Sequence, residues 1–420
     1  MEAHSKLKKN LFGLIILTIS GAFIYTLPYF RSYYYSAFME AFGMTNTQMG
    51  LCGAIFGVLG SFFYLFGGVI TDYFSPRKLI PLSMILTGVL GFCLLLSPPP
   101  YVIVLIHGLW AVTSLMAFWP ALMKCIRAMA SSNEQGKAFG IFEGGRGIVN
   151  TAILAIAAAI FARMLATGSE KLGVTWIIVF YSAMTVGLGL LNIWLLRGID
   201  DVSGKKKGFQ LREVLQPIKI PEVWLMIGII FSTLTVSTGY YYISPYATEI
   251  LGASAMLGVI LTSSSQYIRP IASFLAGILG DKINSSKVML IGQLGLVAGL
   301  GIILVSGASS GIILVVAGGL IVFASMYVCV SMHFAIMVEF DCPPESEGAA
   351  IGLISCVGYL PEATSPYVAG KLLDLFPGAS GYQYFFTYML VIVILGIFLT
   401  LIWFKRTKEK RLLLLKKEKK

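Results

Sequence analysis

Apolar runs recur along the whole sequence, and they constrain the fold more than any other feature. The runs are roughly 18 to 28 residues long, so each can cross the ~30 Å hydrocarbon core of a bilayer as a helix. Charged residues make up only 12% of the 420 residues, and the mean hydropathy is +0.83. A soluble protein of this length carries about twice that charged fraction. The sequence therefore predicts an all-α, polytopic membrane protein.

Twelve transmembrane spans are predicted from these runs. The first run follows Lys6, Lys8 and Lys9 but has no small-residue cleavage site. It is therefore predicted to remain as a helix and not to be removed as a signal peptide. In chain order, the predicted spans are 10–36, 46–70, 79–97, 101–124, 138–164, 174–196, 222–249, 254–280, 288–306, 311–337, 347–372 and 381–404.

The placement of the basic residues explains the formal net charge of +11. Most of the 31 lysines and arginines lie in the two tails, the central interval and alternate turns, on one side of the predicted membrane. By the positive-inside rule this side is cytoplasmic, and the charge marks a membrane face and not a nucleic-acid surface. The predicted organisation is a six-span bundle at 1–196, a cytoplasmic linker at 197–221, a second six-span bundle at 222–404 and a basic cytoplasmic tail at 405–420.

The two predicted bundles contain similar sequence segments, separated by a nearly constant offset of roughly 210 residues. Three pairs of segments recur in the same order. They are Gly68–Asp72 with Gly277–Asp281, Gln135–Gly140 with Glu347–Gly352, and Tyr25–Tyr29 with Tyr242–Tyr246. The offset covers six spans, so the repeated units have the same orientation, and the sequence predicts a parallel six-plus-six duplication.

Over its whole length the chain resembles the major facilitator superfamily of transporters. That family carries a glycine, an acid and several basic residues in the loop after its second span, often echoed after the eighth. The matching residues here are Gly68, Asp72, Arg77 and Lys78 in the first copy and Gly277, Asp281 and Lys282 in the second. Tyr73 and Ser75-Pro76 depart from the usual pattern. The Ser-Pro-Arg turn is similar to the branch that carries organic phosphates and sugar acids.

The acid of each loop copy has a physical role that does not depend on the resemblance. Asp72 and Asp281 lie at predicted helix ends beside cytoplasmic cations, where a carboxylate can pair across a helix interface or cap a neighbouring helix. Gly68 and Gly277, one turn earlier, permit close packing. The residues therefore act either as a conformational latch or as a purely structural turn.

Ionisable groups inside the predicted spans need an energetic reason to be there. At 1.5 Å per residue from the nearest cytoplasmic turn, Glu143 lies about 10 Å deep, Arg146 about 15 Å, Arg269 about 18 Å and Glu362 about 21 Å. Arg31 lies nearer the outer end of the first span. Two arginines and a carboxylate therefore lie near the predicted midplane.

The resemblance implies that the fifth and eighth spans lie side by side, so that Arg146 and Arg269 face one cavity. Two guanidiniums there would bind a phosphate, carboxylate or sulfonate through pairs of parallel N–H hydrogen bonds. Further candidates for this cavity are Arg31, Tyr25, Tyr242, Trp119 and His333. Two alternatives stay open: Glu143 neutralises Arg146 at i,i+3, and Arg269, just before Pro270, caps freed carbonyls.

Glu362 is the candidate for proton coupling, because a desolvated carboxylate can change its charge as its exposure changes. The alternative is a permanent salt bridge to one of the arginines. Tryptophans at span ends are predicted to anchor the chain at the membrane interfaces: Trp176, Trp194, Trp224 and Trp403.

The predicted function is secondary transport of a small organic anion by proton symport or anion exchange, in a bacterial inner (plasma) membrane. An efflux permease for neutral or cationic compounds is the rival. No phosphate-cradling loop, metal-ligand spacing or catalytic constellation is found, so no enzyme activity, cofactor or metal is predicted. The expected partners are an anionic small molecule, protons and lipid, with no nucleic acid, and the protein is expected to be a monomer.

Overall fold

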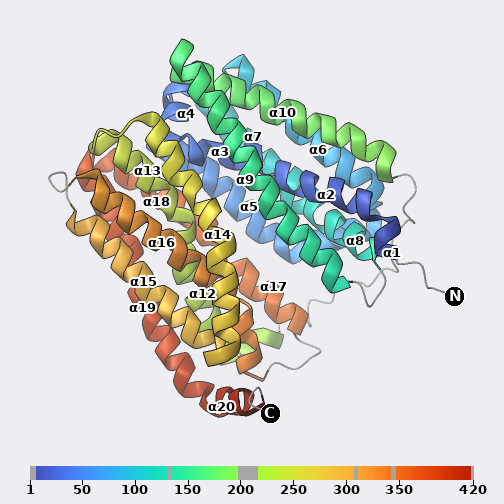
Figure 1. Cartoon of the computed structure of the whole chain (residues 1–420), viewed down its shortest axis with the longest axis vertical. Coiled ribbons are helices and arrows are strands. Elements are labelled where there is room, and N and C mark those ends of the chain that lie inside the picture. The colour runs from blue at the N-terminus through green and yellow to red at the C-terminus, as the bar shows by residue number, and fades with distance from the viewer. Residues whose placement is uncertain (1–5, 131–134, 197–215, 307–310, 342–346, 418–420) are drawn as a thin grey trace. The chain divides into compact units, whose positions relative to one another are not determined.

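The computed structural model describes residues 6–130, 135–196, 216–306, 311–341 and 347–417, and in that part of the chain every regular element is helical (Figure 1). The chain divides by its contacts into two compact units. The first comprises Met1–Met44 and Phe62–Phe209, and the second comprises Thr45–Ser61 and Gln210–Lys420. Residues 45–61, predicted to lie in the N-terminal bundle, therefore pack with the second unit. Most of the predicted linker, 197–215, lies outside the described residues.

The first unit contains the helices that form the first half of the sequence. They are α1 (Lys6–Lys9), α2 (Leu11–Phe23), α3 (Thr26–Tyr33), α4 (Tyr35–Phe42), α6 (Pro76–Cys93), η1 (Leu94–Leu96), α7 (Pro100–Ala111), the π-helical turn η2 (Val112–Phe118), α8 (Trp119–Met129), α9 (Gln135–Thr167) and α10 (Glu170–Leu195). The helix α5 (Asn46–Tyr73) begins in the second unit and ends in the first.

The second unit contains the remaining elements. They are η4 (Gln216–Lys219), α12 (Pro221–Gly239), η5 (Tyr240–Tyr242), α13 (Ile243–Pro245), η6 (Tyr246–Ile250), α14 (Ala255–Ile283), α15 (Ser285–Val305), α16 (Ile312–Met332), η7 (Ala335–Glu339), α17 (Glu347–Gly358), α18 (Pro361–Leu375), α19 (Ala379–Arg406) and α20 (Lys408–Lys417).

Each unit repeats the same helix pairings. In the first, α2 packs against both α9 and α10, and α6 packs against α10. In the second, α12 packs against α17, α18 and α19, and α15 packs against α19. The partners in the two units are the first, third, fifth and sixth spans of each half. This recurrence agrees with the predicted parallel duplication.

Close packing between these helices depends on small residues, since lipid supplies no hydrophobic drive for helix association. A Cβ atom on Gly88 of α6 would lie 2.8 Å from the carbonyl oxygen of Ser182 on α10. In the second unit, Gly299 of α15 and Gly318 of α16 approach each other in the same way, and a Cβ on either would lie 2.9 Å from the other's carbonyl oxygen. These glycines let the backbones touch, which fixes the helix pairs by shape.

Buried polar side chains add hydrogen bonds between helices of one unit. The Asn192 carboxamide nitrogen on α10 donates to the Ser20 hydroxyl on α2 at 2.8 Å. In the second unit, the Thr400 hydroxyl on α19 donates to the carboxamide oxygen of Gln293 on α15 at 2.9 Å. Each bond leaves fewer unpaired polar atoms in an apolar interior, where an unpaired group is costly.

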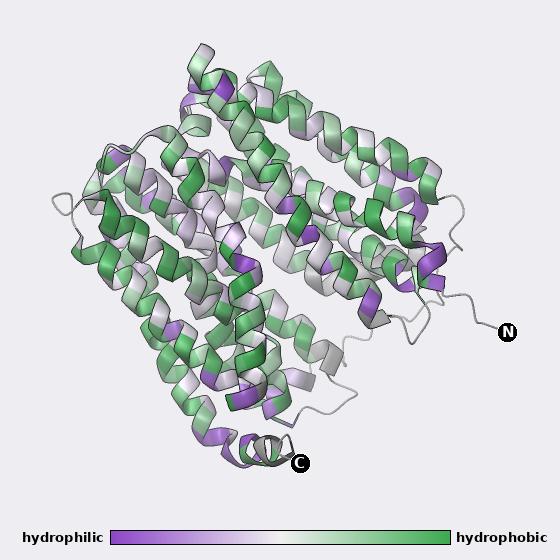
Figure 2. Ribbon diagram, viewed as in Figure 1, coloured by the Kyte–Doolittle hydropathy of each residue, from purple (hydrophilic) through white to green (hydrophobic). Residues whose placement is uncertain are grey.

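Eight helical segments within the described residues are long and apolar enough to cross a membrane, and the bent pair α2 and α3 makes up to nine. The helices α5, α14 and the pair α17 and α18 lie where the other three spans are predicted. Hydrophilic residues gather at the helix ends, while apolar residues cover most of the helix lengths (Figure 2). The all-helical fold is therefore confirmed.

Several predicted spans are broken. The first bends by 45° between Phe23 and Thr26. The eleventh is interrupted at Tyr359–Leu360, immediately before Pro361, because proline has no N–H to continue the helix. The tenth ends at Met332, several residues before the predicted boundary, and continues as η7.

The predicted basic tail is a folded element and not a loose extension. Helix α19 continues to Arg406, and α20 turns away from it beside the C-terminus (Figure 1). The prediction that Trp403 is an interfacial anchor is wrong, since its side chain is fully buried and its indole N–H donates to Glu339 at 2.9 Å. Trp176, Trp194 and Trp224 are exposed, as an interfacial role requires.

Candidate functional site

Arg146 lies on α9 in the first unit, and its side chain is 16% exposed. Its terminal nitrogen is 3.4 Å from a carboxylate oxygen of Glu143, one turn before it on the same helix. The Glu143 side chain is 52% exposed, so solvent weakens this pair. The pair therefore orients the guanidinium without burying a fixed counter-charge beside it.

Arg146 also makes cation–π contacts with two aromatic rings. Its guanidinium carbon lies 5.0 Å from the centroid of Trp119 and 5.4 Å from that of Phe142. Tyr25 completes the group, with its ring 6.1 Å from that of Trp119 in an edge contact. The structure thus brings together four predicted site residues, Arg146, Glu143, Trp119 and Tyr25, from α9, α8 and the break between α2 and α3.

Local irregularities place two of these side chains. Trp119 begins α8 directly after the π-helical turn η2, and Pro120 follows it in the first turn of α8. Gly145 lies against α2, where an added Cβ would be 2.9 Å from a methyl carbon of Thr18. In contrast, a Cβ on Gly144 or Gly147 would meet no atom within 4 Å, so these two glycines leave open space beside Glu143 and Arg146.

Arg31, on α3, is more buried than Arg146, with 6% of the residue exposed. Its Nε is buried without a hydrogen-bond partner, and none of the described carboxylates forms an ion pair with it. His107 on α7 is fully buried, and its Nε2 has no hydrogen-bond partner among the described residues. The first unit therefore contains a second guanidinium on a different helix from the Arg146 group.

Arg269 lies midway along α14 in the second unit and is partly exposed. Its guanidinium carbon is 5.6 Å from the centroid of Tyr327 on α16. Gln266 donates to the Tyr327 hydroxyl at 2.9 Å, and Ser265 donates to the Tyr240 hydroxyl at 3.1 Å. Within the described part of this unit no carboxylate pairs with Arg269, and no carbonyl caps it.

Glu362 lies in the first turn of α18, where a carboxylate is favoured by the helix dipole. Its backbone touches α5, since a Cβ on Gly57 would lie 2.5 Å from the Glu362 carbonyl carbon. Its side chain is partly exposed and forms no ion pair with a described residue of the second unit. The acid therefore lies beside the break between α17 and α18, where a helix end can move.

Two predicted cavity residues of the second unit are buried in packing contacts. Tyr242 is 3% exposed, and its hydroxyl donates to the Pro366 carbonyl at 3.3 Å. His333 is 1% exposed, with Nε2 2.8 Å from the Thr233 hydroxyl and its ring 6.3 Å from that of Tyr359. Tyr242 holds η5 to α18, and His333 holds the end of α16 to α12, so a ligand role for either requires a rearrangement.

The residues of the predicted latch are only partly described. Gly68 and Asp72 lie near the end of α5, and Asp281 lies near the end of α14. The surroundings of these three residues lie outside what the structure describes. Arg77 is partly exposed with a buried, unpartnered Nε, and Lys282 is exposed. A Cβ on Gly277 would meet no atom of the described residues within 4 Å, and the latch stays a prediction.

The sequence did not point to Phe142, Gln266 or Tyr327 as site residues. Phe142 precedes Glu143 directly, and a ring next to the acid-base pair was the available signal. Tyr327 lies on a different helix from Arg269, so only the packing of α14 against α16 brings them together. Among the described residues, no group of three His, Cys, Asp or Glu side chains could hold a metal ion.

Two proteins with related sequences are inner membrane proteins. The inner membrane protein YihN of Escherichia coli K12 is 29% identical over 427 residues, covering 97% of this chain and 98% of its own length. The inner membrane protein YqcE of the same organism is 26% identical, covering 88% and 89%.

Solved structures show the same fold. A bacterial homologue of the human lysosomal transporter Spinster, in an inward-facing and unoccupied conformation, superposes with a TM-score of 0.75 at 13% identity, covering 97% of this chain and 99% of its own. The nucleoside transporter NupG superposes with a TM-score of 0.70 at 14% identity, covering 95% and 99%. A sequence profile of the Major Facilitator Superfamily matches residues 11–366 and 261–420. The chain therefore belongs to the Major Facilitator Superfamily, and it is a multi-pass membrane transporter of the secondary type.

Proposed function

We propose that the protein carries a small organic anion across a bacterial inner membrane by alternating access, driven by proton symport or by exchange for another anion. The cargo class is a sugar phosphate, sugar acid, carboxylate or sulfonate. The names of the relatives YihN and YqcE support the inner-membrane location. The fold shared with Spinster and NupG carries no information about the cargo, because sequence identity to them is 12–14%.

One observation carries this proposal: three arginines lie in the membrane-spanning helices with too few acids to neutralise them. Arg31 and Arg269 have no ion pair among the described residues, and the partner of Arg146 is a half-exposed glutamate. Guanidiniums without fixed counter-charges in an apolar protein are costly, and an anionic ligand offsets that cost. Cationic cargo would be repelled by the same groups.

The aromatic contacts of Arg146 are compatible with bidentate binding of an anion by its guanidinium. The guanidinium lies near the rings of Trp119 and Phe142, and among the described residues only Glu143 pairs with its N–H groups, so donors along its edge remain for hydrogen bonding. Carboxylate, phosphate and sulfonate groups accept two parallel N–H bonds from such an edge. Arg269 beside Tyr327 has the same character in the second unit.

Uptake into proteoliposomes tests the proposal. The purified protein would be assayed with radiolabelled sugar phosphates, sugar acids, carboxylates and sulfonates, alongside neutral and cationic compounds. With the anion that is transported, Arg146→Gln and Arg269→Gln should each lower uptake about 10- to 100-fold, the loss expected for a charge-assisted bidentate contact. Arg146→Lys should recover only part of the uptake, because lysine lacks the planar fork.

Arg163→Gln is the matched control, because Arg163 is an exposed arginine near the other end of α9. It should transport like the wild type. Transport of cations or neutral compounds alone, or full anion uptake in Arg146→Gln and Arg269→Gln, would reject the anion site.

A further inference from the structure

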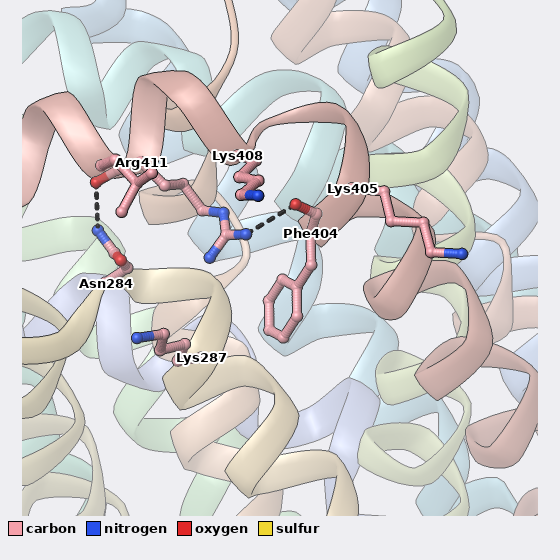
Figure 3. A pocket seen from close by; sticks show the side chains of 7 residues that line it. Asn284, Lys287, Phe404, Lys405, Lys408 and Arg411 are labelled. Carbon is pink, nitrogen blue, oxygen red and sulfur yellow. Dashed lines mark hydrogen bonds between the residues drawn. The ribbon is translucent and has the colours of Figure 1, made fainter.

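A pocket of about 320 Å³ lies at the end of the second unit where the chain leaves the last long helix (Figure 3). Its walls come from the end of α19, from α20 and from the turn between α14 and α15. The residues that line it are Asn284, Lys287, Phe404, Lys405, Lys408, Arg411 and Leu412. Four of the seven are basic and none is acidic.

The turn between α19 and α20 builds one wall of this pocket. Arg411 folds back across the turn, where its Nε donates to the Thr407 hydroxyl at 3.1 Å and a terminal nitrogen donates to the Phe404 carbonyl at 2.8 Å. Its guanidinium carbon lies 4.5 Å from the centre of the Phe404 ring. With its side chain 11% exposed, Arg411 is a fixed part of the wall (Figure 3).

The charge of Arg411 is already balanced by Glu339. This buried carboxylate lies 4.0 Å from the Arg411 Nε and also accepts from the Ser286 amide and the Trp403 indole, each at 2.9 Å. Lys287, Lys405 and Lys408 are different, because they are exposed and pair with no carboxylate among the described residues. The Lys405 side chain points away from the other two lysines (Figure 3). The pocket therefore has two cations, Lys287 and Lys408, available for an anion.

A neutral acceptor lies among these cations. Asn284 is 7% exposed, and its carboxamide nitrogen donates to the Arg411 carbonyl at 3.4 Å. Its carboxamide oxygen is buried and has no hydrogen-bond donor among the described residues. A ligand that satisfies the whole pocket must therefore bring a donor, such as a hydroxyl, in addition to a negative charge.

The surroundings of the pocket match a membrane surface. Leu412 and Leu413 of α20 are 51% and 59% exposed, next to the lysines of the same helix. Exposed leucines beside lysines are typical of a helix that lies at a bilayer interface. The positive-inside rule places this end of α19 at the cytoplasmic face, where basic pockets between helices bind anionic headgroups.

We infer that this pocket binds the headgroup of an anionic glycerophospholipid whose phosphodiester contacts Lys287 and Lys408 and whose headgroup hydroxyl donates to Asn284. Phosphatidylglycerol has this chemistry. A bound lipid would hold α20 against the turn between α14 and α15. This inference does not depend on the cargo that the transporter carries.

Native mass spectrometry of the full-length protein in detergent, titrated with defined lipids, tests the inference. Phosphatidylglycerol should bind more tightly than phosphatidylcholine, and more tightly than phosphatidylmethanol, which has the phosphodiester but no hydroxyl. Lys287→Gln and Lys408→Gln should each weaken phosphatidylglycerol binding about fivefold, as expected for one basic residue near a lipid phosphate. Lys371→Gln, at an exposed lysine of α18, is the matched control and should bind like the wild type.

A second variant tests the hydroxyl contact separately. Asn284 has a φ of 84°, a conformation that glycine adopts without strain, so Asn284→Gly should keep the fold while removing the acceptor. In this variant phosphatidylglycerol and phosphatidylmethanol should bind equally. Phosphatidylglycerol binding unchanged in all lysine variants would overturn the site, and binding of soluble glycerol phosphate as tight as that of the lipid would overturn the assignment to lipid.

Discussion

Arg146 has two kinds of partner, and they differ in how strongly water weakens them. The Glu143 carboxylate is half-exposed, so its attraction is that of a surface ion pair, about 0–1 kcal/mol. The rings of Trp119 and Phe142 lie 5.0 and 5.4 Å from the guanidinium carbon, and these cation–π contacts carry no net charge that would compete with an anionic ligand. The rings therefore help to position the arginine, while its charge is only weakly neutralised by Glu143.

A substitution at Glu143 measures how far this acid competes with cargo. Glu143→Gln removes the competing charge but keeps a similar side-chain shape, so the apparent KM for the transported anion should fall by up to about fivefold. The measurement is the concentration dependence of uptake in proteoliposomes. Glu170→Gln, at another acid of the first unit, should leave the KM unchanged. An increase in KM in Glu143→Gln would show that the acid assists binding instead.

At the scale of elements, the first half of α5 is held by α18 within the second unit. Gly50 and Gly57 of α5 touch the backbone of α18 at Pro366 and Ala363, and Gly370 of α18 touches Asn46. The Asp374 carboxylate, at the end of α18, caps the start of α5 by accepting from the amides of Asn46 and Thr47 at 3.2 and 2.7 Å. The glycine contacts depend on the close fit of the two backbones, and the Asp374 cap depends on charge.

The Asp374 cap makes the start of α5 sensitive to pH. Burial by itself raises the pKa of Asp374, but the hydrogen bonds from Asn46 and Thr47 outweigh it, so the pKa lies below its usual value. A carboxyl group of this kind stabilises the folded state above its unfolded pKa, and the contribution is lost as the pH falls through the lowered folded pKa. The cap should therefore be fully formed at neutral pH.

Hydrogen exchange of the Thr47 amide tests the cap. Asp374→Asn should speed its exchange about fivefold at neutral pH, the effect of losing roughly 1 kcal/mol of capping stabilisation. As the pH falls through the lowered pKa of Asp374, the wild-type carboxyl is protonated as well, and the difference should shrink. Glu249→Gln, at an acid bonded to Tyr382, is the control and should leave Thr47 unaffected. Identical exchange rates of the Thr47 amide in Asp374→Asn and the wild type would show that Asp374 does not stabilise the start of α5.

At the scale of the whole molecule, a transporter of this family needs a group that couples an ion gradient to movement of its helices. Glu362 is an acid that lies within a predicted span and pairs with no described residue of its unit. It stands at a helix break, with Gly57 of α5 against its backbone. A change of its charge would therefore be felt where α17, α18 and α5 meet.

Uptake driven by a pH gradient tests this role. Glu362→Gln should lose accumulation driven by an inward proton gradient but keep exchange of labelled for unlabelled anion, because only the coupled proton is removed. Both would be measured in the same proteoliposomes. Glu222→Gln, which breaks an exposed ion pair with Arg406, should retain both activities. Proton-driven accumulation in Glu362→Gln equal to that of the wild type would exclude the glutamate from coupling.

The sequence predicted those features that depend on local spacing or on average hydropathy. The helical membrane fold follows from apolar runs, and the Arg146–Glu143 contact follows from i,i+3 spacing on one helix. The partners of Arg146 from α8 and of Arg269 from α16 could not be predicted, because they depend on which helix faces pack together. The burial of Tyr242 and His333 was missed for the same reason.

Segments at the boundaries of the predicted bundles pack differently from what their sequences indicate. Residues 45–61 precede the first loop motif and are predicted to be part of the N-terminal bundle, yet glycine contacts hold them to α18. The basic tail has the composition of a solvated charge run, yet Arg411 is buried against Glu339. Both cases depend on one or two tertiary contacts, which composition does not record.

The glycine contacts between α5 and α18 differ from the Asp374 cap in the distance over which they act. Dispersion between touching backbones loses a quarter to a half of its strength when a gap of about 0.5–1 Å opens, whereas the attraction between a charge and a helix end declines gradually. A small displacement of α18 would thus release much of the glycine contact while the carboxylate still pulls the helix start back. Such a joint has one stable position, the closed one, and the carboxylate should return the start of α5 to it after a small displacement.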